Sequence, residues 1–207
     1  MPQVASLLID DRVEEITLPE GTLLLYRHAM AAQASDFLER LVRDVAWRQE
    51  SITLFGKHHL QPRLSAWYGD PDASYRYSGL DNTPHPWTAD LQTLRQSVQA
   101  ICGHRFNSVL LNYYRNGNDA MGMHADDEPE LGPQPVIASL SLGAPRRMRF
   151  IHRKRTHPPL NLVLEPGSLL IMSGATQRNW KHGINRSKRI CGPRVNLTFR
   201  RILTTER

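Results

Sequence analysis

Hydrophobic residues in the second half of the chain occur in short runs, and glycine or proline separates most of these runs. Runs of four to eight residues at this spacing predict the many short strands of a sandwich or barrel. The expected strands cover residues 108–115, 136–142, 148–151, 160–164, 168–172 and 195–202. The pattern therefore favours a mainly β fold of the jelly-roll type.

The first half of the chain combines two helical patterns with short apolar runs at 4–8 and 23–26, which predict strands. Helices are expected over 33–46 and 87–101, the second after Pro86 and before Gly103. Their apolar faces consist of Phe37, Leu38, Leu41, Val42 and Val45 in the first helix, and Leu91, Leu94, Val98 and Ile101 in the second. We expect a single α+β domain over 1–207, with an N-terminal extension over 1–107 and a jelly-roll core over 108–204.

Composition narrows the class of protein. The chain has 207 residues, of which 40% are hydrophobic and 22% charged, as in an ordinary packed domain. No apolar stretch approaches the roughly 20 residues that span a membrane, and the first residues lack the basic region of a signal peptide. Two cysteines, Cys102 and Cys191, do not make a disulfide framework in a chain of this size. These features favour an intracellular protein, cytoplasmic in a bacterium or nuclear in a eukaryote, with no membrane partner.

Positive charge is concentrated in two places. The net charge is +6 and the pI is about 9.7. Residues 146–157 contain six lysines and arginines, and a second cluster consists of Arg186, Lys188 and Arg189. Such runs are either solvated surface segments or contacts to a polyanion such as nucleic acid, and charge alone leaves both interpretations open.

His124, Asp126 and His182 are candidate metal ligands. Two histidines and one carboxylate form the ligand set of non-haem iron(II) sites with open coordination positions. In an extended segment, side chains at i and i+2 point to the same side, so His124 and Asp126 can share one ion. We expect a strand to begin at residue 123, and His182 to come from another strand. Because the HxD pattern is common by chance, ordinary surface or half-buried histidines remain the alternative.

Polar residues alternate with apolar ones near the C-terminus. Arg194, Asn196, Thr198 and Arg200 share one face of the expected strand, and Asn112 and Tyr114 share a face of another. Arginine holds carboxylates through two parallel charge-assisted hydrogen bonds, so two arginines suit a dicarboxylate. One arginine could instead orient a metal ligand. The alternative is a half-exposed strand whose polar face meets solvent.

Four motifs match a known family. They are LNYY at 111–114, HADDE at 124–128, IASLSLG at 137–143 and PRVNLTFR at 193–200. With these motifs, over about residues 55–202, the chain resembles the AlkB family of iron(II)- and 2-oxoglutarate-dependent nucleic-acid dioxygenases, whose core is a double-stranded β-helix. The resemblance implies that His124, Asp126 and His182 bind the catalytic iron. It also implies a set of residues that bind 2-oxoglutarate: Asn112, Tyr114, Arg194, Asn196, Thr198 and Arg200.

Motifs in the N-terminal half refine this resemblance. FGK at 55–57, PR at 62–63, YGD at 68–70 and YRYSG at 75–79 resemble the branch that repairs duplex DNA, that of AlkB homologue 2. The resemblance implies that Phe55, on a hairpin, fills the gap left by a flipped base, and that Tyr77 and His124 sandwich that base. The other implied substrate residues are Arg63, Tyr75, Asp127 and Glu128. In the alternative, Phe55 is a core strand residue, Tyr75 and Tyr77 form a paired strand face, and Arg63 is a surface charge.

The implied reaction is oxidative demethylation of N1-methyladenine and N3-methylcytosine in DNA, with O2 and 2-oxoglutarate consumed and formaldehyde released. The target nucleotide must leave the duplex stack, and an aromatic wedge offsets part of that cost. We expect a monomer that prefers duplex DNA. Three alternatives remain: the same chemistry on RNA or single strands, a non-catalytic nucleic-acid-binding module, and a zinc hydrolase with the same three ligands. The hydrolase offers no reason for the arginine strand.

Overall fold

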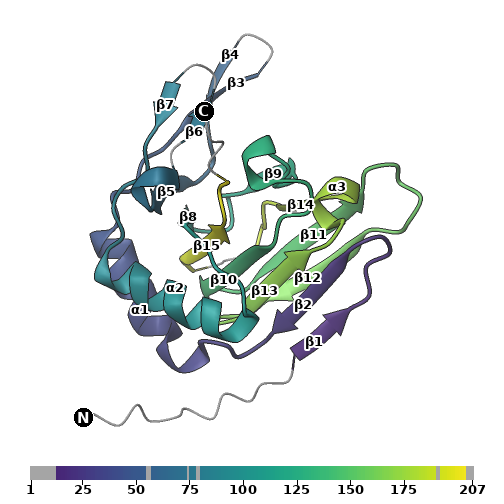
Figure 1. Ribbon diagram of the computed structural model, residues 1–207, viewed down its shortest axis with the longest axis horizontal. Helices are drawn as coiled ribbons and strands as arrows, with labels where there is room; N and C mark the ends of the chain where they lie inside the picture. The colour runs from purple at the N-terminus through teal and green to yellow at the C-terminus, as the bar shows by residue number, and fades with distance from the viewer. Residues whose placement is uncertain (1–12, 55–56, 74, 78–79, 190–191, 204–207) are drawn as a thin grey trace.

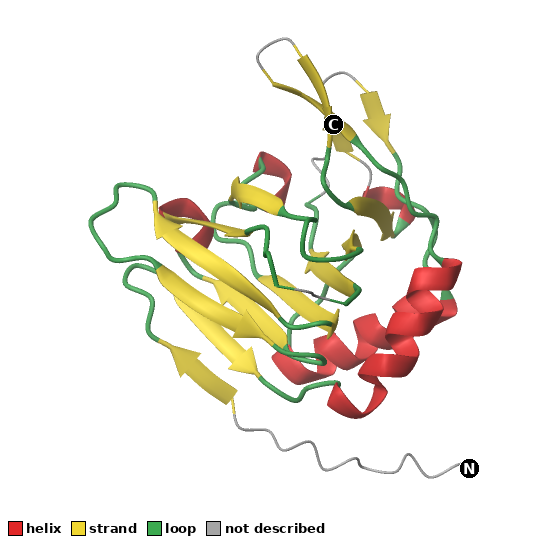
Figure 2. Cartoon of the chain, turned by 180° about the vertical axis from the view of Figure 1, so that it is seen from behind, coloured by secondary structure: helices red, strands yellow, loops and turns green. Residues whose placement is uncertain are grey.

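The computed structural model describes residues 13–54, 57–73, 75–77, 80–189 and 192–203. Two antiparallel sheets face each other, and two helices cover the outer side of the larger sheet (Figures 1 and 2). This arrangement confirms the predicted mainly β jelly roll with helices from the N-terminal half.

The larger sheet has seven strands and the smaller one four, and all neighbouring strands are antiparallel. The order of the larger sheet is β1 (Val13–Ile16), β2 (Thr22–Tyr26), β13 (Leu169–Ser173), β10 (Ile137–Gly143), β15 (Arg194–Arg200), β8 (Ser108–Tyr114) and β5 (Leu64–Gly69). The order of the smaller sheet is β12 (Leu160–Leu164), β11 (Arg146–His152), β14 (Trp180–Ile184) and β9 (Met121–His124). Two separate hairpins are formed by β3 (Ser51–Leu54) with β4 (Lys57–Leu60), and by β6 (Tyr75–Tyr77) with β7 (Leu80–Asn82).

The helices are α1 (Ala34–Asp44), α2 (Ala89–Cys102) and the short α3 (Thr176–Asn179). Single 3-10 turns cover Ala31–Gln33, Pro71–Ala73 and Pro129–Leu131. Both ends of α2 follow from its sequence. The Thr88 hydroxyl caps its first turn by accepting from the Leu91 amide, and Gly103 ends it in the left-handed region at φ +71°.

Two apolar cores lie on opposite faces of the larger sheet. The first lies between this sheet and the helices, where Phe37 of α1 and Leu94 of α2 belong to the same cluster as Leu197 of β15. The second lies between the two sheets and includes Phe150 of β11 and Trp180 of β14. Because β15 turns its apolar residues toward the helices, its polar residues face the space between the sheets.

Several predicted elements differ from those observed. The strand at 23–26 is confirmed, whereas the run at 4–8 lies outside the described residues. The prediction that a strand begins at residue 123 was wrong, because β9 starts at Met121 and ends at His124. Strands β2 and β5, from the part of the chain before residue 108, belong to the larger sheet, and the division into 1–107 and 108–204 stays a prediction.

Two further expectations concern sequence features outside the sheets. Among the described residues, no helix is both long and apolar enough to cross a membrane. Cys102 carries a free thiol, and Cys191 lies outside the described residues.

Candidate active site

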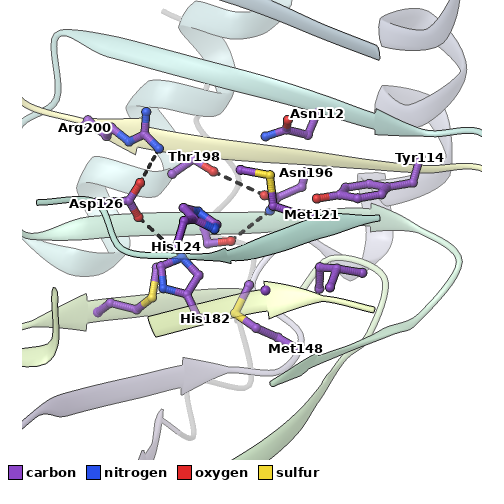
Figure 3. Close-up of a pocket in the computed structure, with 14 residues that line it drawn as sticks. Asn112, Tyr114, Met121, His124, Asp126, Met148, His182, Asn196, Thr198 and Arg200 are labelled. Carbon is purple, nitrogen blue, oxygen red and sulfur yellow. Dashed lines mark hydrogen bonds and ion pairs between the residues drawn. The ribbon is translucent and has the colours of Figure 1, made fainter. Parts of the chain in front are cut away.

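The two histidines of the HxD…H pattern face each other across neighbouring strands. His124 ends β9 and pairs in register with His182 of β14, with their ring centroids 4.4 Å apart (Figure 3). Asp126 follows β9 after one residue, is only 1% exposed, and its Oδ2 lies 3.5 Å from Nε2 of His182. The structure thus brings the three residues together, with donor atoms within 4.8 Å of one another.

Each of the two imidazoles can offer a ring nitrogen to a metal. The Nδ1 of His124 lies 2.9 Å from the carbonyl oxygen of Gly122. Because a carbonyl only accepts, Nδ1 carries the proton and Nε2 keeps a lone pair for a metal. Burial lowers the pKa of His182 to about 4, so this ring is uncharged near neutral pH.

Asp126 is held in its charged form and in one position. Burial alone would raise the pKa of its carboxyl group, but the Arg200 guanidinium and the two histidines outweigh burial and lower that pKa. Arg200 donates to Oδ1 of Asp126, and the Asp126 amide donates to Oε1 of Gln177 at 3.0 Å. The sequence suggested that one of the two arginines could orient a metal ligand. Arg200 has this position, because it holds the carboxylate of Asp126, a candidate ligand.

The other carboxylate oxygen of Asp126 fits a metal. Among the described residues, Oδ2 of Asp126 is buried without a hydrogen-bond partner. An unsatisfied buried anionic oxygen is costly, and a cation next to it removes that cost. Two imidazole nitrogens and this oxygen form the ligand set that suits iron(II) with open positions.

Arg194 is the second arginine of β15 and lies deep in the protein. It is 1% exposed, its Nη2 donates to Oγ of Ser141 at 2.9 Å, and its guanidinium carbon lies 5.1 Å from the ring centroid of Tyr114. Its Nε and Nη1 are buried and have no hydrogen-bond partner within the described part of the chain. Burial lowers the pKa of Arg194. A buried guanidinium with two free N–H groups fits the terminal carboxylate of a dicarboxylic acid.

The amides and hydroxyls on this face form a connected network. Asn196 donates to Oγ of Ser139 at 2.8 Å and to the carbonyl of Leu140 at 3.0 Å, and the Thr198 hydroxyl donates to Oδ1 of Asn196. Asn112 is the register partner of Asn196 on β8. These contacts fix the orientation of the Asn196 amide before any ligand binds.

A cavity between the two sheets collects most of the expected residues (Figure 3). It is lined by His124, Asp126, His182, Asn112, Tyr114, Asn196, Thr198 and Arg200, together with methionines. Arg194 does not line this cavity, but it lies against Tyr114, which does. The cavity therefore extends from the candidate metal ligands to Tyr114, whose ring contacts the Arg194 guanidinium.

The expected substrate residues are only partly described. Phe55 lies outside the described residues, and Tyr75 and Tyr77 are placed on β6 by their backbone alone. Asp127 is exposed and accepts from Nη2 of Arg153 at 2.5 Å. Glu128 is half-buried, and its Oε2 has no hydrogen-bond partner among the residues described. An unpartnered carboxylate oxygen two residues from Asp126 can accept hydrogen bonds from a base edge.

Arg63 is not a free surface charge, because it contacts Asn112 of β8. Its Nε donates to Oδ1 of Asn112 at 2.6 Å, and burial lowers the pKa of the Arg63 guanidinium.

If Asn112 holds 2-oxoglutarate, replacement of Arg63 by methionine removes one charge-assisted hydrogen bond that orients the Asn112 amide. We expect the KM for 2-oxoglutarate to rise about tenfold, the equivalent of about 1.4 kcal/mol, in a succinate assay. The exposed Arg48 provides a matched control, Arg48→Met, with an unchanged KM. A rise in the KM for nucleic acid alone would instead assign Arg63 to the substrate.

Sequence reasoning missed several polar residues that support the site. Gln177 is 1% exposed and binds the Asp126 amide, and Ser139 and Ser141 support Asn196 and Arg194. The alternation of serine and leucine in IASLSLG was the available signal for the two serines. The assignment of Arg146 to the surface basic cluster was wrong, since this residue is 4% exposed. It donates to the backbone carbonyls of Asn116, Asp119 and Asn185 because a buried guanidinium must satisfy its donors.

The geometry agrees with a comparison against known protein families. Residues 21–200 match the family described as the 2OG-Fe(II) oxygenase superfamily. The protein is therefore an iron(II)- and 2-oxoglutarate-dependent oxygenase.

Individual relatives narrow this class. Alpha-ketoglutarate-dependent dioxygenase alkB homolog 3 of Homo sapiens is 42% identical over 205 residues, which cover 92% of this chain and 70% of that protein. DNA oxidative demethylase ALKBH2 is 41% identical in Mus musculus over 191 residues (89% and 80%) and 33% identical in Arabidopsis thaliana over 217 residues (91% and 69%). The chain belongs to the AlkB family. The solved structure of OsALKBH1 covers 91% of the chain with a TM-score of 0.63 at 16% identity, which supports the fold.

Proposed function

We propose that this protein oxidatively demethylates alkylated bases in DNA, with N1-methyladenine and N3-methylcytosine as substrates and formaldehyde as a product. The observation that carries the proposal is one cavity that joins the His124–Asp126–His182 set to a polar face containing Asn112, Asn196 and Thr198. Relatives that share about two fifths of its residues are named DNA oxidative demethylases. Since DNA lies within the cell, the enzyme acts there, and we expect it to act as a monomer.

The chain's own residues divide the work of the reaction. His124, Asp126 and His182 would hold iron(II), which when bound supplies the oxidation of the methyl group by O2. Arg194 would bind the far carboxylate of 2-oxoglutarate, with Tyr114 and Asn112 beside it. Arg200 keeps Asp126 charged and oriented, and Gln177 fixes its backbone. Asp126, His182 and Arg194 are almost fully buried, and low exposure to water strengthens their electrostatic contacts.

The chemistry balances with these co-substrates. One oxygen atom of O2 enters a C–H bond of the methyl group, and the other enters succinate as 2-oxoglutarate loses CO2. The hydroxymethyl group then leaves as formaldehyde, its hydroxyl proton passes to water, and the base nitrogen keeps the electron pair of the broken C–N bond. No side chain needs to form a covalent bond to the substrate.

Exposed cations around the smaller sheet support a polyanionic substrate. Arg147, Lys154 and Arg155 are exposed on β11 or just after it, and Arg186 and Lys188 are exposed after β14. Lysine and arginine side chains that contact phosphates supply most of the sequence-independent affinity for DNA. We infer that these residues contact the DNA backbone while the flipped base enters the cavity.

The experiment that tests this function measures formaldehyde and succinate from oligonucleotides that contain N1-methyladenine. With iron(II), ascorbate and 2-oxoglutarate, the wild-type protein should release both products in equal amounts. His124→Ala, which removes a half-buried ligand, should release neither. Succinate without formaldehyde would mean an oxygenase with another substrate, and no product at all would contradict the proposed function.

The preference for duplex DNA is tested by the same assay. Residues 55 and 56 join β3 to β4, and Phe55 would fill the gap left by the flipped base. Phe55→Ala should lower the rate on duplexes about tenfold and leave the rate on single strands unchanged, since a wedge offsets an unstacking cost of a few kcal/mol only in a duplex. Equal losses on both substrates would contradict the wedge and favour single-stranded DNA or RNA.

A further inference from the structure

A second group of metal-ligating side chains lies away from the catalytic cavity. Glu20, in the turn between β1 and β2, meets His152 at the end of β11 and His157 in the loop that follows. One donor atom from each residue lies within 4.8 Å of the other two. None of the three lines the catalytic cavity. We propose that this group binds a zinc(II) ion that fastens the β1–β2 turn to the β11–β12 loop.

The donor set suits zinc. Two imidazoles and one carboxylate, with water as the fourth ligand, form a known type of zinc coordination. With bond lengths of about 2.0–2.1 Å, two ligand atoms on a tetrahedral zinc lie about 3.3 Å apart. The Nε2 of His152 and Oε2 of Glu20 are 3.2 Å apart, so one edge of such a tetrahedron is already in place. The donor atom of His157, in a loop, lies within 4.8 Å of both, so a movement of this loop can complete the tetrahedron.

His152 is buried and hydrogen-bonded in the way that is usual for a histidine that binds a metal. It is 2% exposed, and its Nδ1 lies 2.8 Å from the Thr156 hydroxyl. In metal sites, the second ring nitrogen of a ligating histidine is almost always hydrogen-bonded, which fixes the tautomer and the direction of the first. Here the Thr156 contact leaves Nε2 directed at Glu20.

Neighbouring residues fix the other two members. The ring of His157 stacks on that of Trp180 at an interplanar angle of 23°. The Trp180 indole donates to the carbonyl of Pro19 at 2.8 Å, and Asn179 donates to the carbonyl of Glu20 at 3.0 Å. The β1–β2 turn, the loop after β11 and α3 therefore meet at one end of the sandwich (Figure 1).

The backbone takes an unusual conformation at two residues of this region, Glu20 and Arg155. Within the described ranges, the non-glycine residues with positive φ are Glu20 and Arg155, both at φ +56°. Such conformations persist where surrounding contacts impose them, and they are concentrated at ligand-binding and active sites. One is a proposed ligand, and the other lies between the two proposed histidine ligands.

Zinc binding is tested in a His124→Ala background, because the catalytic ligands would also bind zinc. Tag-free protein, stripped with a chelator, is titrated with zinc(II) in competition with a chromophoric chelator. His124→Ala should bind one equivalent of zinc and show a zinc-dependent rise in Tm. His124→Ala with His157→Gln or with Glu20→Gln should lose both effects, whereas the exposed His104→Gln should keep both. Neither Glu20 nor His157 is fully buried, so both variants should fold, which circular dichroism can verify.

The hydrogen bond between Thr156 and His152 allows a second test, in which zinc affinity should fall without being lost. In the same background, Thr156→Ala should weaken zinc affinity about tenfold, as expected for loss of a hydrogen-bond partner of a ligand. If His124→Ala binds no zinc, or if His157→Gln and Glu20→Gln leave its affinity unchanged, the proposal is wrong. None of these readouts depends on demethylase activity, so the zinc site and the proposed function can fail separately.

Discussion

Asp126→Ala is expected to reduce succinate formation at least about 100-fold and to abolish the visible charge-transfer band of the iron(II)–2-oxoglutarate complex in anaerobic protein. Loss of an outer-shell partner of a metal ligand typically costs 10–100-fold, and loss of the ligand itself exceeds that range. The same change leaves the Arg200 guanidinium without its buried counterion. Breaking a buried pair on one side costs about 3 kcal/mol, so the free energy of unfolding of iron-free protein should fall by about this amount in a urea titration.

The stability effect of Asp126 depends on pH in a defined direction. The pKa of this carboxyl group is lower in the folded protein than in the unfolded chain. Its contribution is therefore fully present above the unfolded pKa of about 3.9, and it is lost as the pH falls through the folded value. The difference in stability between iron-free wild type and Asp126→Ala should be constant between roughly pH 5 and 7 and shrink below roughly pH 4. A variant as stable as wild type at pH 7 would contradict the role of the Asp126–Arg200 pair.

Arg194→Met should have opposite effects on ligand binding and on stability. If the two unpartnered N–H groups of Arg194 hold the far carboxylate of 2-oxoglutarate, their loss removes two charge-assisted hydrogen bonds. A loss of about 3 kcal/mol weakens the affinity for 2-oxoglutarate about 100-fold, measured by calorimetry on protein loaded with a redox-inert divalent metal. In ligand-free protein the same change removes buried donors that lack partners, so the free energy of unfolding should rise by about 1 kcal/mol.

A matched control separates these effects from general changes in charge. Arg147, on β11 of the smaller sheet, is exposed, so Arg147→Met should leave both the 2-oxoglutarate affinity and Tm unchanged. A drop in the Tm of ligand-free Arg194→Met would show that this arginine supports the fold more than the ligand. An unchanged affinity would remove Arg194 from the co-substrate site.

The sequence predicted elements best where the period of the pattern was clear. The alternation in PRVNLTFR gave both the strand and its faces, because a period of two has one structural solution. Thr88 and Gly103 mark the ends of α2, since caps depend on local residues. By contrast, β1 reads VEEI, and three of its four residues are exposed, so no apolar alternation marks it.

The site was predicted as a set of residue types, and its supporting contacts were not. Gln177 lies in the four-residue α3 and reaches Asp126 across 51 positions in the chain, a contact that no local pattern encodes. Arg146 and Arg147 are adjacent in a basic run, yet the first is buried and the second exposed. Charge clusters show how many cations a segment contains, but the pleat of the strand decides which of them reach water.

Both faces of β15 are enclosed, one by the helices and one by the smaller sheet, so an error in the pairing of this strand is costly. A shift of one residue in the pairing of β15 with β8 or β10 would place Arg194 and Arg200 among the apolar side chains under the helices and Leu197 in the catalytic cavity. No misregistered form can thus be compact and inactive at low energetic cost. Mispairing of this strand should therefore reduce the number of competent molecules in a population, while each correctly paired molecule keeps its full turnover.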